Sequence, residues 1–244
     1  MNRNKFIKTS FIGGLALTIF PHLSFTKFQE RYSRDQLIGK GNPDLIGESF
    51  KMHKDAYASF LKMQAAAQKE NISIELVSAY RSFEKQKEIF EKKYTLYTSK
   101  GLTPTEAIDK IIEYSTIPGT SRHHWGTDID IIDNNAPRPE SVLLAKHFSE
   151  EGPFFKLKEW LLKNANSYGF HEVYTNDLSR KGFKYEPWHY SYAPVSKPML
   201  QAYCELDINK VLQEELILGS EYFSEAFINK YRSENILDIN PELL

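Results

Sequence analysis

Residues 121–130 read Ser-Arg-His-His-Trp-Gly-Thr-Asp-Ile-Asp, a pattern typical of a loop that leads into a β-strand. Its second half alternates polar and apolar residues, as a half-buried β-strand does, so Asp128 and Asp130 share one face. His123 lies in the loop before this strand, and Gly126 permits a backbone bend that a larger residue would resist. The stretch therefore predicts that His123 and Asp130 converge on one point.

A second segment, Glu186-Pro187-Trp188-His189, supplies a further histidine and a carboxylate in addition to those of the first segment. His189 would be a third ligand from a neighbouring strand, which leaves the fourth tetrahedral position of a zinc ion open to water or substrate. Two imidazoles and one carboxylate keep the site positively charged, so the pKa of a bound water falls to about 7. Glu186 precedes a proline, which favours an extended backbone at this residue. Because it is not one of the three ligands, we expect Glu186 to act as the general base. The two segments predict a catalytic zinc site.

Two further side chains beside the ligands have supporting roles in this interpretation. His124 is the nearest rival of His123 as a ligand, and we expect it to pack or to hydrogen-bond near the site. Asp128, on the same strand face as Asp130, either orients a ligating histidine or competes as a ligand. We favour the orienting role.

Substrate-binding candidates come from both motifs and from an earlier corner. Residues 72–77 predict a buried strand, and Arg81 follows directly where a helix begins. An arginine at that corner could stabilise an oxyanion or bind a substrate carboxylate through two hydrogen bonds. Gln86 and Ser121 could add neutral hydrogen bonds, and Trp188 adjoins the third ligand.

Composition narrows the class of protein. The chain has 244 residues, of which 41% are hydrophobic and 26% charged, as in a soluble globular domain with appendages. Lys and Arg number 31 against 32 Asp and Glu, so a nucleic-acid partner is not expected. Cys204 is the single cysteine, which excludes an intrachain disulfide and a cysteine-based zinc ribbon. Any metal must be held by histidine and carboxylate.

The N-terminus resembles an export signal. Arg3, Lys5 and Lys8 precede an apolar stretch over residues 11–20, which is short for a membrane span of about 20 residues. No small-x-small cleavage site occurs between residues 17 and 27, so cleavage and retention as an anchor both stay open. We expect the protein to work outside the cytoplasm, in the periplasm or cell envelope.

Periodicity along the chain divides it into four parts. Helices are predicted over 48–70 and 156–167, and a strand is predicted within 182–192. The expected parts are a signal or anchor over 1–25, an irregular lead-in over 26–47, the catalytic domain over 48–195, and a C-terminal helical extension packed on it over 196–244.

The motifs resemble those of the VanY-type zinc D-alanyl-D-alanine carboxypeptidases and their L,D-carboxypeptidase relatives. The family patterns are S-x-H-x-x-G-x-A-x-D and E-x-x-H, and their fixed positions, Ala excepted, fall on Ser121, His123, Gly126, Asp130, Glu186 and His189. The resemblance covers about residues 72–192. It implies an α+β fold of the hedgehog/DD-peptidase type, with a central antiparallel sheet flanked by helices.

The resemblance also implies an activity: an exported zinc metallopeptidase that removes a C-terminal D-alanine from peptidoglycan stem peptides. The implied roles are zinc ligation by His123, Asp130 and His189, and general base catalysis by Glu186. Asp128 departs from the pattern, which has alanine there. Alternatives are an endopeptidase of the same fold and a non-catalytic wall-binding module, although an intact base argues against the latter.

Overall fold

A computed structural model describes residues 32–244. The predicted signal or anchor over residues 1–25 lies outside the described residues. From Arg34 to Leu244 the chain forms one compact unit, and the internal boundaries at residues 47 and 195 stay predictions. Within the described part, no helix combines the length and apolarity needed to cross a bilayer.

A four-stranded antiparallel sheet lies at the centre, in the order β3-β4-β6-β5. Its strands are β3 (Ile74–Ser78), β4 (Asp128–Asp133), β6 (His189–Tyr192) and β5 (Phe170–Glu172). In the register of the two middle strands, Asp130 is paired directly with His189. Directly opposed residues on antiparallel strands have neighbouring Cβ atoms. The sheet thus brings two residues 59 positions apart into contact, and the predicted α+β architecture is confirmed.

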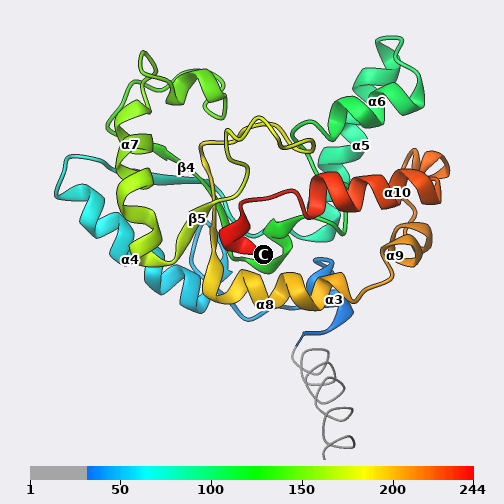
Figure 1. The fold of residues 1–244 in the computed structure, drawn as a ribbon, viewed down its shortest axis with the longest axis horizontal. Helices are drawn as coiled ribbons and strands as arrows, with labels where there is room; N and C mark the ends of the chain where they lie inside the picture. Colours follow the sequence, from blue (N-terminus) through cyan, green and yellow to red (C-terminus); the bar gives the residue numbers. More distant parts are fainter. Residues whose placement is uncertain (1–31) are drawn as a thin grey trace, which may run out of the picture. The chain divides into compact units, whose positions relative to one another are not determined.

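One face of the sheet is covered by α4 (Lys54–Gln68) and α7 (Phe155–Asn164), which lie together on the left of Figure 1. Their apolar stripes share a core with Ile129 and Ile131, the inward residues of β4. Short 3-10 helices over Ala145–Phe148 and Ala165–Tyr168 flank α7. Because side chains alternate along a strand, Asp128 and Asp130 point away from this apolar core.

The predicted corner is formed by α5 (Phe83–Ser99), which Ser82 caps by accepting a hydrogen bond from the backbone of Lys85. The next helix, α6 (Pro104–Ile111), begins with a capping box in which Thr103 and Glu106 bond reciprocally. A 3-10 helix, η1 (Arg122–Trp125), then leads into β4. These segments carry the loop and the corner of the predicted site.

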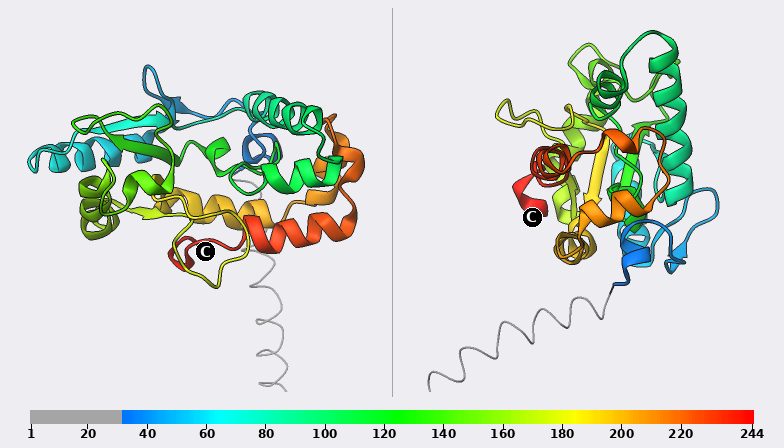
Figure 2. Two further views of the ribbon diagram at one scale, coloured as in Figure 1. Left: turned by 90° about the horizontal axis from the view of Figure 1, so that it is seen from above. Right: turned by 90° about the vertical axis from the view of Figure 1, so that its right-hand side faces the viewer.

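The C-terminal extension comprises α8 (Ala193–Cys204), α9 (Ile208–Glu214), α10 (Glu225–Tyr231), a π-helical turn (Arg232–Ile236) and 3-10 turns at Ser220–Tyr222 and Pro241–Leu243. Figures 1 and 2 show α9 and α10 at the end of the fold remote from α4. The Tyr203 hydroxyl donates to the carbonyl of Gly119 at 2.9 Å, and the backbone N–H of Ile117 donates to the Tyr231 hydroxyl at 3.1 Å. The extension therefore holds the loop before η1 in place through these two hydrogen bonds.

Two predictions on the N-terminal side were wrong: where the first long helix begins, and that the lead-in has no regular elements. The helix expected from residue 48 begins at Lys54, because Met52–His53 forms β2 and pairs with β1 (Leu45–Ile46). The lead-in expected to be irregular contains this β1 strand and the short helix α3 (Arg34–Leu37). Both elements are too short for periodicity to indicate them.

The strand predicted within residues 182–192 pairs only over His189–Tyr192. Before it, the backbone N–H of His189 donates to the carbonyl of Glu186 at 3.0 Å, which closes a turn. Pro187 has no N–H to offer a neighbouring strand. The strand therefore begins only at His189, after a turn that starts at Glu186. This turn directs the Glu186 side chain toward His189.

Glu172, at the end of β5, provides a test of stability against pH. Its Oε1 is buried with no hydrogen-bond partner in the described chain, and burial raises the pKa of its carboxyl from 4.5 to about 7 against the opposing charges of Lys158 and Arg180. The folded state then holds more protons than the unfolded state between about pH 4.5 and 7, so stability falls as pH rises through this window. Above it, the loss is about 3 kcal/mol.

Glu172→Gln is expected to raise the melting temperature by several degrees at pH 8 and to leave it unchanged near pH 4.5. Thermal unfolding followed by circular dichroism at both pH values measures this. Glu150→Gln, at an exposed position, is the control and is expected to change neither value. An equal shift of the Glu172 variant at both pH values would show that the carboxyl charge is not the cause.

Candidate active site

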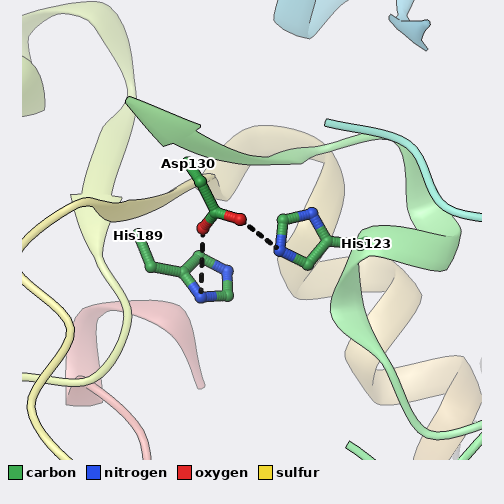
Figure 3. Close-up of side chains that lie close together, drawn as sticks. All are labelled: His123, Asp130 and His189. Atoms are coloured by element: carbon green, nitrogen blue, oxygen red, sulfur yellow. Dashed lines mark ion pairs between the residues drawn. The ribbon is translucent and has the colours of Figure 1, made fainter. Parts of the chain in front are cut away.

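Three side chains from three segments converge on one point (Figure 3): His123 from η1, Asp130 from β4 and His189 from β6. One ligand atom from each lies within 4.8 Å of the others, and all three residues are buried. This is the set predicted from the sequence.

Gly126 makes the approach of His123 possible. Its φ of 68° lies in the left-handed region, and a Cβ there would come within 2.6 Å of the Leu45 side chain and 2.9 Å of the His53 backbone nitrogen. Glycine has no Cβ and no steric penalty at such an angle. Ser121 caps the preceding 3-10 helix by accepting from the backbone N–H of His123. The predicted bend is therefore present.

A hydrogen bond at Nδ1 fixes the orientation of the His123 ring. Nδ1 lies 2.7 Å from the carbonyl oxygen of Ala79, so it donates there and leaves Nε2 without a proton. Nε2 faces Oδ2 of Asp130 at 3.5 Å. Burial and the nearby Arg81 guanidinium hold the pKa of His123 well below its usual value. A neutral imidazole with a free Nε2 is the form that binds metal.

His189 faces Asp130 with Nδ1, whereas His123 faces it with Nε2. Nε2 lies 3.0 Å from Oδ2 of Asp128, while Nδ1 lies 2.9 Å from Oε2 of Glu186 and 3.9 Å from Oδ1 of Asp130. Burial lowers the pKa of His189, but its hydrogen bonds to Asp128 and Glu186 outweigh burial and raise the pKa to about 10. A metal ion at Nδ1 therefore displaces a proton.

Asp130 completes a set that fits a divalent metal ion. Its Oδ1 is buried, and no group in the described part of the chain hydrogen-bonds to it. Burial, with Glu186 and Asp128 nearby, raises the pKa of its carboxyl to about 6. An orphaned carboxylate oxygen between two imidazole nitrogens is costly without a cation. Two nitrogens and one oxygen are the ligands of catalytic zinc sites.

The guanidinium of Arg81 lies beside the ligands. Its Nη2 is 4.0 Å from Oδ2 of Asp130 and 2.9 Å from Oγ of Ser78, and its Nη1 donates to Oε1 of Gln86 at 2.8 Å. His124 binds the Arg81 carbonyl through Nδ1 at 2.6 Å and accepts from the N–H of Gly119 through Nε2 at 3.1 Å. His124 thus joins the Arg81 corner to the loop before η1.

A cavity of about 380 Å³ opens onto this centre, and among the residues that line it are Arg81, Ser121, Glu186, Trp188, Tyr174 and Lys93. Gln86, which we expected at the substrate, does not line it, because its amide bonds to Arg81 and to the carbonyl of Thr116. Tyr174 and Lys93 were missed. For Lys93 the available signal was its helical spacing from Gln86 through Ile89.

Comparison with known proteins decides the family. The model of the family described as VanY, D-alanyl-D-alanine carboxypeptidase, matches residues 49–195, more than half of the chain. This chain belongs to the VanY family. The match spans both ligand-bearing motifs and the corner at Arg81.

Individual relatives match parts of this chain. An uncharacterized protein of Haemophilus influenzae is 36% identical over 43% of this chain and 82% of its own length. A D-alanyl-D-alanine carboxypeptidase of Enterococcus faecalis is 31% identical over 53% of this chain, and the match spans less than half, 44%, of that enzyme.

Two solved structures share the fold. VanYB in complex with D-alanine-D-alanine has a TM-score of 0.52 at 24% identity and covers 72% of this chain and 91% of its own. A VanY mutant from a VanB-type resistance cassette, in complex with Zn(II), has a TM-score of 0.51 at 24% identity and covers 70% and 90%.

Asp128, where the VanY pattern quoted above has alanine, sits in a closed polar network. Its Oδ2 accepts from Nε of Arg122 and Nε2 of His189, each at 3.0 Å. Its Oδ1 accepts from the hydroxyls of Ser191 at 2.5 Å and Thr127 at 2.9 Å. Burial raises the pKa of Asp128, but Arg122 and His189 lower it well below its usual range. We expect this carboxylate to fix the ring of His189 with Nδ1 on the side of Asp130, where it would be available to a metal ion.

Asp128→Asn tests that role. An amide nitrogen cannot accept, so two of the four donors lose their acceptor and Arg122 loses its buried counter-charge. We expect a loss of about 3 to 5 kcal/mol of unfolding free energy and a 10- to 100-fold weaker zinc affinity. Chemical denaturation and a zinc competition titration measure the two. Asp133→Asn, at the far end of β4, is the affinity control, and equal zinc affinity of all three proteins would contradict the positioning role.

Proposed function

We propose that this chain is a zinc carboxypeptidase that removes a C-terminal D-alanine from peptidoglycan stem peptides. The observation that carries the proposal is the buried His123–Asp130–His189 set with Oε2 of Glu186 2.9 Å from the inward nitrogen of His189. Membership of the VanY family supports the reaction, and VanYB's complex with D-alanine-D-alanine supports the substrate class.

Each residue has a role that follows from its place. A zinc ion on the three ligands would polarise the scissile carbonyl and acidify a water molecule. Oε2 of Glu186 takes the proton from the attacking water and returns it to the leaving amine. The Arg81 guanidinium, 4.0 Å from Asp130, stabilises the negative charge that develops on the carbonyl oxygen. Trp188 and Tyr174, both buried at the cavity wall, limit the access of bulk water.

Location is part of the proposal. Peptidoglycan is assembled outside the cytoplasm, and the basic, then apolar N-terminal sequence is typical of exported proteins. We infer that the enzyme acts in the cell envelope, with its N-terminus either cleaved or retained as an anchor. Fractionation of cells that express the full chain with a C-terminal tag should place it in the envelope fraction, and a purely cytoplasmic protein would contradict export.

The reaction is tested by mass spectrometry of defined stem peptides incubated with the zinc-loaded chain, beside Glu186→Gln. Loss of one D-alanine from the pentapeptide establishes D,D-carboxypeptidase activity, whereas loss from the tetrapeptide establishes L,D-carboxypeptidase activity. Internal fragments favour the endopeptidase of the same fold. Intact peptides with zinc bound would contradict the proposal and favour a wall-binding module.

A further inference from the structure

The wall of the active-site cavity carries a second cation besides Arg81. Lys93 lies on α5, and Gln86, Ile89 and Lys93 are spaced i, i+3 and i+7, which places them along one face of the helix. Gln86 faces Arg81, while Ile89 and Lys93 line the cavity. Lys93 therefore lies two turns, about 10 Å, along α5 from Gln86.

Lys93 forms no salt bridge within the described chain, in contrast to Lys85 and Lys87 on the same helix. The acidic group that acts on its charge is Glu186, which lines the same cavity. Lys85 pairs with Glu88 at 2.8 Å and Lys87 pairs with Glu91 at 3.0 Å. The residues three and four positions from Lys93 on either side are Ile89, Phe90, Leu96 and Tyr97, none of them acidic. No carboxylate of residues 32–244 lies within 4.0 Å of its ammonium group.

The surroundings of Lys93 make a bound anion favourable. The side chain is half-buried, and burial followed by the charge of Arg81 lowers the pKa of its ammonium group against the opposing charge of Glu186. Two cations on one cavity wall repel each other, and a partly desolvated ammonium is costly. Glu186 offsets only part of this cost, because the pKa of Lys93 stays lowered. An anionic group between them removes both penalties. The cavity that Lys93 lines is the one that holds the three metal ligands and Glu186.

Arg81 is placed to act on different atoms. Its two terminal nitrogens already bond to Gln86 and Ser78, and one of them lies 4.0 Å from the metal ligand Asp130. With a metal ion on the three ligands, the proposed function would put this charge beside the scissile carbonyl. The terminal carboxylate of a carboxypeptidase substrate lies one residue further along the peptide, about 3.5 Å of extended chain. It needs its own cation, farther from the metal ligands.

We propose that Lys93 binds the free C-terminal carboxylate of the substrate and so makes the enzyme an exopeptidase. The inference rests on the proposed function, because it names the group that recognises the residue to be released. It assigns Arg81 to the oxyanion and Lys93 to the carboxylate, and thereby separates the two roles that the sequence left open for Arg81.

The test compares two capped peptides that end in D-alanyl-D-alanine, one as the free acid and one as the C-terminal amide. Lys93→Met keeps the length and apolar body of the side chain and removes the charge, and Lys93→Arg restores the charge. Lys92→Met, at the exposed neighbouring position, is the control. Steady-state kinetics with the zinc-loaded full chain give kcat and KM, and calorimetry with Glu186→Gln chains, with and without Lys93→Met, gives binding of the same two peptides.

For the free acid, Lys93→Met should raise KM at least tenfold with kcat within threefold of wild type, while Lys93→Arg and Lys92→Met stay near wild type. Kinetics on the amide should be the same for wild type and Lys93→Met. An equal loss on acid and amide, or no loss on the acid, overturns the role of Lys93. If wild type cleaves neither peptide, the proposed function fails, and calorimetry alone then tests Lys93. Binding of the free acid that requires Lys93 supports the carboxylate site. Binding of the free acid without Lys93, or no binding at all, overturns the carboxylate site.

Discussion

Glu186→Gln should lower kcat by about 10² to 10⁴ and leave the zinc content at one ion per chain. Glutamine keeps the shape of the side chain but cannot take a proton from water. Glu186 is buried at the turn before His189, where its Oε2 lies 2.9 Å from Nδ1 of that ligand. Metal analysis of the purified protein and peptide turnover by mass spectrometry measure the two quantities.

Activity and zinc content, measured together on this variant, distinguish a general base from a metal ligand. Lost activity with retained zinc is expected of a base that is not a ligand. Lost activity with lost zinc would make Glu186 a ligand and contradict its assignment as a base. Activity within a few fold of wild type would mean that proton transfer uses another group. The melting temperature of the variant serves as the control for folding.

Asp130→Asn should abolish both zinc binding and activity while it stabilises the chain without metal. Burial raises the pKa of the Asp130 carboxyl to about 6. In metal-free protein, stability therefore falls as pH rises from about 4 to 6, because the folded state binds the proton more tightly than the unfolded state. A neutral amide removes this cost. At pH 8 the metal-free variant should melt above the metal-free wild type.

Zinc should reverse that order. Wild type gains stability from every ligand that binds only the folded state, whereas the variant has lost its anionic ligand and should not respond. Thermal melts at pH 8 with chelator and with added zinc give all four values. A variant that melts below wild type in chelator, or that gains as much from zinc as wild type does, would contradict the role of Asp130.

The metal ligands could be predicted because local sequence determines their placement. A left-handed glycine three residues after His123 and alternation through Asp130 indicate a loop that turns into a strand. The pairing of Asp130 with His189 cannot be read from either segment alone. It depends on the register between β4 and β6. The choice of His189 rested on the set of ligands that catalytic zinc requires, and the family pattern contains the same residue.

Residues whose role depends on packing between distant elements were placed less well. Gln86 looks like a substrate residue by position, but its amide is occupied by Arg81 and Thr116. Arg122 was read only as part of the motif, although it neutralises the buried Asp128. Lys93 is one of several lysines on α5 in the sequence, and only the position of the helix beside the cavity distinguishes it.

We expect that one zinc ion on His123, Asp130 and His189 makes this chain a peptidase. Titration of the metal-free protein with zinc, with turnover of a D-alanyl-D-alanine peptide measured at each addition, tests it most directly. We predict no turnover without metal, a linear rise in turnover as zinc is added, and a plateau at one equivalent of zinc per chain. Turnover by the metal-free protein, or a plateau that requires two equivalents, would contradict it.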